Sequence, residues 1–223
     1  MRQRNRPCLI HEDDALLASF VPHLLQDLEH RKGMDLVTLE VLGRREIVEK
    51  IALPSVDNVT LRRLYQDRTG AAGYILWPEG ASKLLTKSSE GRPGLADAFI
   101  SNLYGLSARQ IEPAGLIQLD MCEHYGVQAP TQTETTISNS AKPLPAQDGK
   151  WRFKLRRITA QLRMGWRALT VLHRAQRCCI SLNSPQLNLD PHGKIMRPEY
   201  DGGHFDLVTR DGPTRSLLLV ACL

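Results

Sequence analysis

The sequence has no long apolar run. A helix that spans a bilayer needs about 20 consecutive apolar residues, and the longest candidate among the 223 residues, residues 216–223, is much shorter. No apolar segment follows the basic residues 1–6, so the pattern of a secretory signal peptide is also missing. We therefore expect a cytoplasmic protein without a transmembrane helix.

Cys-x-x-Cys pairs are missing as well. The five cysteines are scattered and odd in number, at Cys8, Cys122, Cys178, Cys179 and Cys222. Zinc sites and the disulfide frameworks of small secreted domains use closely and regularly spaced cysteines. The sequence therefore argues against both and favours a reducing compartment.

Acidic residues are absent from residues 150–177, which contain nine Lys or Arg. The positive net charge of +5 therefore comes from this one region and is not spread evenly along the sequence. Large apolar residues recur at helical spacing through this region: Trp151, Leu155, Ile158, Leu162, Trp166, Leu169 and Leu172. The combination predicts a basic amphipathic helix over residues 150–178.

Two interpretations of this helix remain open. Its tryptophans and basic residues suit the surface of the inner membrane, where indole rings favour the headgroup level and Lys or Arg attract anionic lipid. The other interpretation is that the apolar stripe packs onto the preceding domain and the charges are solvated. We do not expect a nucleic-acid partner, because no aromatic and glycine pattern of a known RNA or DNA motif accompanies the charges.

The stretch from Cys8 to Ala15 organises the rest of the sequence. It is a short apolar run that ends in three consecutive carboxylates, Glu12, Asp13 and Asp14. It predicts a buried strand that delivers these side chains to the C-terminal edge of a sheet, where open α/β sheets bind ligands. Carboxylate oxygens are preferred ligands of Mn2+ or Mg2+, so the three side chains could form a metal site. The alternative interpretation is that they belong to a solvated turn or to an acidic cluster at a helix N-terminus.

The remaining periodicities alternate between helices and strands and predict an α/β fold. A helix over residues 20–31, capped by Ser19, should pack on a sheet through Phe20, Leu24, Leu25 and Leu28. Further expected elements are a strand over residues 34–41 with solvated ends at Asp35 and Glu40, a loop over 43–50, one or two short strands within 51–65, a strand over 71–76, a helix over 78–88, and a strand over 111–119 broken by Pro113.

The domain organisation follows from composition. Residues 1–127 form the α/β domain, and residues 128–149 are rich in Thr, Ser, Gln and Pro, which is typical of a linker. The basic helix follows over 150–178. Residues 179–223 contain four prolines and several glycines without a clear period, so we expect a loosely ordered tail.

The order of these pieces resembles the glycosyltransferase family 25 domain, the group that includes bacterial lipooligosaccharide galactosyltransferases, over roughly residues 7–137. The resemblance is carried by short motifs in the same order: Cys8 to Ala15, Asp35 to Glu40, Gly70 to Leu76, Gly80 to Leu85, Leu95 to Asp97, Pro113 to Gln118, and Thr135 to Ile137.

The resemblance implies an inverting, metal-dependent transferase with a GT-A-like, Rossmann-like sheet. By the family pattern, Glu12, Asp13 and Asp14 hold Mn2+ or Mg2+ and the sugar diphosphate, and Asp97 is the catalytic base or positions the acceptor. Gly70 and Gly73 leave space for the donor or the acceptor. The implied reaction transfers a hexose, usually galactose, from a UDP-hexose to a glycan hydroxyl in lipopolysaccharide or lipooligosaccharide biosynthesis.

The sequence also departs from the family pattern. Family members usually carry a further strand and helix ahead of the acidic motif, whereas Met1 lies seven residues ahead of Cys8, so we expect a sheet that is incomplete at its N-terminal side. His11 stands where an aliphatic residue is common, and Trp77-Pro78 replaces a Ser-Arg or Ser-Lys pair. The rival functions are a non-catalytic remnant of such a domain and a basic module that binds a membrane surface.

Overall fold

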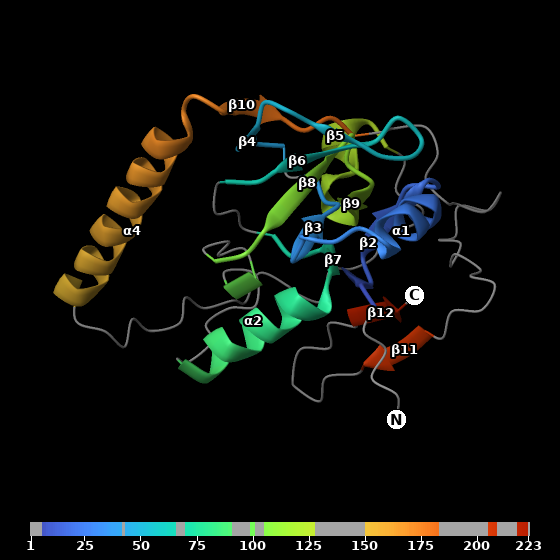
Figure 1. Ribbon diagram of the computed structural model, residues 1–223, viewed down its shortest axis with the longest axis horizontal. Coiled ribbons are helices and arrows are strands. Elements are labelled where there is room, and N and C mark those ends of the chain that lie inside the picture. Colours follow the sequence, from blue (N-terminus) through green and yellow to red (C-terminus); the bar gives the residue numbers. More distant parts are fainter. Residues whose placement is uncertain are drawn as a thin grey trace.

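A sheet of eight strands forms the centre of the computed structural model (Figure 1). The structure describes residues 6–41, 43–65, 70–90, 99–100, 105–127, 150–182, 205–208 and 218–222. The strands of the large sheet, in chain order, are β1 (Cys8–Glu12), β3 (Leu36–Thr38), β5 (Leu53–Pro54), β6 (Thr60–Arg63), β7 (Gly73–Leu76), β8 (Ala108–Glu112), β11 (Phe205–Val208) and β12 (Leu218–Cys222).

The sheet is mixed rather than parallel. Its order is β11-β12-β1-β7-β3-β8-β6-β5, and only β3 and β8 pair in parallel. The order strand, helix, strand of β1, the first helix and β3 is typical of a parallel unit. Instead β7 lies between β1 and β3 and runs antiparallel to both. The fold class, mixed α/β, is as expected.

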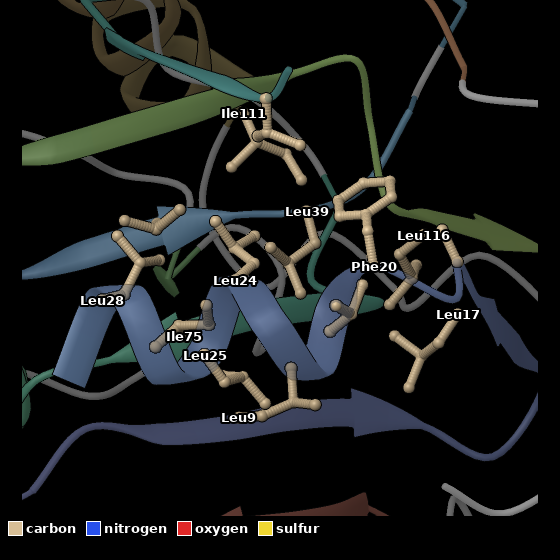
Figure 2. Packing of buried hydrophobic residues seen from close by; sticks show 14 of the residues in the cluster. Leu9, Leu17, Phe20, Leu24, Leu25, Leu28, Leu39, Ile75, Ile111 and Leu116 are labelled. Carbon is tan, nitrogen blue, oxygen red and sulfur yellow. The ribbon is translucent and has the colours of Figure 1, made fainter. Parts of the chain in front are cut away.

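Helix α1 (Val21–Glu29) covers one face of this sheet. Figure 2 shows part of the cluster that joins Leu24, Leu25 and Leu28 of the helix to Leu9, Ile75 and Ile111 of the sheet. Val21 of the helix and Val37 of the sheet belong to the same cluster. Each fully buried leucine stabilises the fold by about 1.5–3 kcal/mol relative to an exposed one. The predicted apolar face of α1 is confirmed. The predicted Ser19 cap is wrong, because Phe20 is the N-cap residue and makes no side-chain cap bond.

The other face of the sheet carries a second cluster, and α2 (Pro78–Glu90) follows directly on β7. The cluster contains Leu36, Val48, Leu64, Tyr74 and Ala108. Leu36 and Val37 are consecutive in β3 and belong to clusters on opposite faces, as the alternation of side chains along a strand requires. The sheet is therefore buried on both sides.

Two small sheets extend the large one. Strand β2 (Ala15–Leu17) pairs with β9 (Leu116–Gln118), and β4 (Arg45–Glu49) pairs with β10 (Ala175–Cys179). Two single-turn 3-10 helices, η1 (Leu119–Met121) and η2 (Glu123–Tyr125), follow β9. The expected break near Pro113 is present, because β8 ends at Glu112 and β9 begins in the small sheet.

Residues 43–50 and 172–178 correct the sequence-based assignment. The first range is not a loop but contains β4. The basic helix α4 (Lys150–Val171) ends at Val171, not at residue 178, and β10 begins at Ala175. The two strands pair with each other although more than a hundred positions separate them. Strand β4 is mostly charged, and β10 was assigned to the end of the basic helix, so neither strand could be recognised without its partner.

The ends of β3 require another correction. Asp35 and Glu40 are buried rather than solvated. The Asp35 carboxylate accepts hydrogen bonds from the Lys83 ammonium group and from the Ser107 backbone N–H, both at 2.6 Å. The buried carboxylate thus fastens α2 and the start of β8 to β3.

Part of the expected loose tail belongs to the large sheet. Strand β12 pairs with the outer edge of β1, and β11 pairs with β12. Cys8 is disulfide-bonded and lies opposite Cys222 in this register, whereas Cys122, Cys178 and Cys179 are free. The expected linker, residues 128–149, lies outside the described residues. None of the helices that the structure describes has both the length and the apolar character needed to cross a bilayer.

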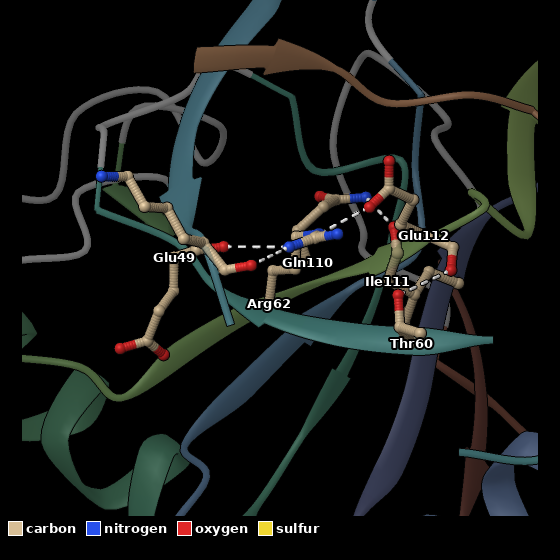
Figure 3. Close-up of polar contacts among 7 residues, drawn as sticks. Glu49, Thr60, Arg62, Gln110, Ile111 and Glu112 are labelled. Atoms are coloured by element: carbon tan, nitrogen blue, oxygen red, sulfur yellow. Dashed lines mark hydrogen bonds and ion pairs between the residues drawn. The ribbon is translucent and has the colours of Figure 1, made fainter. Parts of the chain in front are cut away.

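Arg62 ties together strands at the far end of the sheet (Figure 3). Its Nε donates to Glu112 Oε2 at 2.6 Å, and its Nη1 donates to the carbonyl oxygens of Glu49 at 3.2 Å and Lys50 at 2.6 Å. The Thr60 hydroxyl donates to the Glu112 carbonyl oxygen at 3.1 Å. These bonds hold β4 against β6 and β8, next to the point where β10 joins β4.

The close approach of α2 to β3 generates a test of this packing. A Cβ atom added at Gly80 would lie 2.2 Å from the Asp35 carbonyl oxygen, which is backbone and cannot swing away. Gly80→Ala should therefore lower the free energy of unfolding by about 2 kcal/mol or more. Gly165→Ala is the matched control, because Gly165 in α4 has open space around it and alanine favours a helix by about 1 kcal/mol. Urea unfolding of both variants checks the expectation, and equal stabilities would contradict it.

Candidate functional site

The acidic motif lies where the chain leaves the large sheet. Glu12 is the last residue of β1, Asp13 and Asp14 form a turn, and β2 follows. Both sides of the turn are fixed by backbone hydrogen bonds: the Glu12 N–H donates to the Ala72 carbonyl at 2.9 Å, and the Leu119 N–H donates to the Asp14 carbonyl at 3.0 Å. The expected strand that ends in carboxylates is confirmed.

A second carboxylate-bearing strand end lies at the same edge. The Ala72 backbone N–H donates to Glu40 Oε2 at 3.2 Å, and the Leu39 N–H donates to the Gly73 carbonyl at 3.1 Å. Because β7 runs antiparallel to β1 and β3, its first residues meet the last residues of both neighbours. The backbone of Ala72 thus lies between Glu12 and Glu40.

The three acidic side chains of the motif have different surroundings. Glu12 Oε2 accepts a hydrogen bond from Gln118 Nε2 at 3.0 Å. Asp13 is exposed. Asp14 is half-buried, and its Oδ1 atom is buried without a hydrogen-bond partner. Among the described residues, no Lys or Arg forms an ion pair with Asp13 or Asp14.

Burial and, to a lesser extent, nearby negative charges make Asp14 hard to ionise. Burial raises the pKa of its carboxyl group, and the charges of Asp13 and Asp120 raise it further, against an opposing hydrogen bond from its own backbone. Burial, together with the charge of Glu12, also raises the pKa of Tyr74 to about 12. The edge of the sheet therefore carries an excess of negative potential, and a cation would relieve it.

The carboxylates are better suited to a cation that a substrate phosphate also binds than to a cation whose ligands all come from the protein. Within the part of the chain that the structure describes, no three His, Cys, Asp or Glu side chains gather closely enough to hold a metal ion by themselves. Mg2+ in nucleotide sites is commonly held by one or two carboxylates, with substrate phosphates and water supplying the other ligands. Asp14, with its unpartnered buried oxygen and the nearby Asp120, matches that type of donor set.

The other expected site residues are placed unequally. Gly70 has φ +134°, a conformation that favours glycine. Gly73 lies in β7, where a Cβ atom would lie 1.9 Å from Leu116 Cδ1, so the room at this glycine is filled by a neighbouring side chain. Asp97 lies outside the described residues.

His11 behaves as a structural residue. It is buried, its Nδ1 lies 2.9 Å from the Glu12 carbonyl oxygen, and burial lowers the pKa of its imidazole. The local pattern did not identify Glu40 or Asp120 as parts of this edge. The available signal was position alone, because each lies two residues beyond the end of a strand.

The unfavourable ionisation of Asp14 predicts a gain in stability when its charge is removed. The folded-state pKa is raised above the ordinary value of 3.8, so ionisation costs the folded state free energy at neutral pH. Asp14→Asn should raise the free energy of unfolding at pH 7 by on the order of 0.5–1 kcal/mol, a figure discounted for solvent exposure. The gain should fade below pH 3.8, where the carboxyl group is protonated in both states.

Urea unfolding at pH 7 and at low pH measures this difference. The control is Glu123→Gln, which removes an exposed carboxylate from η2 and should change stability little at either pH. A loss of stability in Asp14→Asn at pH 7 would mean that the carboxylate already has a favourable partner in the chain.

Comparisons with known proteins leave the family open. No protein-family model matches this chain, and no match was found among curated proteins or among solved structures. The mixed α/β class is established by the strand order itself. Any finer assignment depends on the residues and contacts described above.

Proposed function

We propose that this chain is a glycosyltransferase domain of the family 25 type, with a GT-A-like sheet. It would transfer a hexose, galactose being the family's usual choice, from a UDP-hexose to a glycan hydroxyl in lipopolysaccharide or lipooligosaccharide assembly. The observation that carries the proposal is spatial: four of the segments that resemble the family, far apart in the sequence, meet at one edge of the sheet.

Direct contacts join these four segments. The segment with the acidic motif bonds to Ala72 in the glycine-containing segment, and Ala72 bonds to Glu40 at the end of the second matching strand. Gln118, in the fourth segment, bonds to Glu12. A coincidental resemblance would not require these pieces to be neighbours, whereas a shared substrate site would.

The side chains at this edge suit a diphosphate held through a cation. Asp14 would bind the ion, and Asp13 would add negative potential from its exposed position. Gln118 would keep Glu12 oriented. When bound, Mn2+ or Mg2+ supplies Lewis-acid stabilisation of the charge that develops on the departing diphosphate.

The acceptor side of the reaction needs a base. In an inverting transfer, a hydroxyl of the acceptor attacks the anomeric carbon, the bond to the diphosphate oxygen breaks, and a carboxylate takes the hydroxyl proton. Asp97 is assigned this role on the family resemblance alone. The glycan acceptor and the UDP-hexose donor are likewise proposed on the family resemblance.

The proposal predicts linked binding of UDP and Mn2+. Together they should raise the melting temperature of the chain, by the equivalent of about 2.7 kcal/mol when UDP is at 100 times its Kd. Asp14→Asn should abolish this shift although it stabilises the unliganded chain, whereas Glu123→Gln should keep it. Thermal unfolding with UDP, Mn2+, both or neither measures the effect, and UDP release from UDP-galactose with a lipooligosaccharide acceptor measures transfer.

Two outcomes would contradict the proposal in different ways. A shift with UDP and Mn2+ that is unchanged in Asp14→Asn would remove the acidic motif from the site. No shift with any combination of UDP and Mn2+ would favour the rival function, a remnant that keeps the fold without binding nucleotide.

A further inference from the structure

Helix α4 presents a row of large apolar side chains to solvent. Their exposed fractions are 58% for Leu155, 50% for Ile158, 68% for Leu162, 71% for Trp166 and 63% for Leu169. Spacings of three and four residues place them along one face. Soluble proteins rarely expose a contiguous row of large apolar side chains, and such a patch commonly marks an interaction site.

The helix is joined to the body of the protein at one end. Val171 is buried, and the Lys50 ammonium group donates to the His173 carbonyl at 3.0 Å. The Lys50 backbone N–H donates to the Arg174 carbonyl at 2.8 Å, and β10 continues into the pairing with β4. Figure 1 shows α4 standing to one side of the sheet, with β10 beyond its C-terminal end. The apolar row is therefore not used to attach the helix.

The helical register assigns basic positions to both sides of the apolar row. By the register of a helix with 3.6 residues per turn, positions 152, 156, 163 and 167 fall along one flank and positions 150, 154 and 157 along the other. All seven are Lys or Arg, and α4 contains no Asp or Glu. An apolar row between two positively charged flanks matches a surface with an apolar interior and a negatively charged outer layer.

We propose that α4 binds the surface of an anionic lipid bilayer, with Leu155, Ile158, Leu162, Trp166 and Leu169 inserted at the level of the headgroups. The helix is about 33 Å long at 1.5 Å per residue and would lie in the plane of the membrane. Its binding strength comes from buried apolar area and from attraction to anionic headgroups. Membrane binding through α4 does not depend on the transferase activity.

Charge argues against the other occupants of this row. A second copy docked through the same face would bring two helices of seven positive charges each into contact. Nucleic acid would satisfy the charges but leave the apolar row in water. A membrane with anionic lipid satisfies both features at once.

Flotation of the full chain with phosphatidylcholine vesicles, with and without phosphatidylglycerol, tests the proposal. The wild type should float only with the anionic vesicles, and less so as salt rises. The double variant Leu162→Gln, Trp166→Gln should bind at least about tenfold more weakly, because two inserted side chains are lost. The matched control is Ile51→Gln, Leu85→Gln, which changes two side chains that are 74% and 72% exposed elsewhere and should bind like the wild type.

Several results would overturn the proposal. One is an absence of binding to anionic vesicles, and another is equal binding by the wild type and the α4 double variant. A lower melting temperature of this variant without lipid would show that the row packs within the chain. Loss of a wild-type dimer in the variant would assign the row to a second copy. Salt-sensitive binding to duplex DNA, unchanged in the variant and without vesicle binding, would assign the helix to nucleic acid.

Discussion

Ala72 makes the two backbone contacts on which the candidate site depends. Its carbonyl oxygen accepts from the Glu12 backbone N–H and its own N–H donates to the Glu40 carboxylate, so the backbone of one residue fixes the spacing of two strand ends. This is possible only because β7 runs against both neighbours and begins where they finish. A fully parallel sheet would have placed the start of β7 at the opposite edge, far from the acidic turn.

The site combines rigid support with unsatisfied charge. The backbone of the turn is bonded on both sides, and Gln118 holds Glu12. Against this, Asp14 keeps a buried oxygen without a partner while neighbouring carboxylates oppose its ionisation. Natural proteins tolerate such a local free-energy cost mainly at functional sites, where a bound ligand can provide the missing interaction.

Local sequence patterns predicted the elements whose own residues carry a clear apolar spacing. Strand β1, helix α1, strand β7 and helix α2 have apolar spacings that can be read without reference to the rest of the chain. Strand β4 could not be predicted, because its partner β10 lies far downstream and its own sequence is mostly charged. The burial of Glu40 was equally inaccessible, since it follows from the Ala72 contact and not from neighbouring residues. The position of the acidic turn could be predicted from the sequence, whereas the burial of Asp14 Oδ1 without a hydrogen-bond partner could not.

The pairing of β12 with β1 has a consequence for the order of assembly during synthesis. Strand β1 and its outer neighbour β12 are separated by more than 200 positions in the sequence. Until β12 has been synthesised, one side of β1 has exposed amide and carbonyl groups that could pair with another nascent chain. Closure of this edge is therefore a late step, and the edge remains open for most of the synthesis of the segment between the two strands.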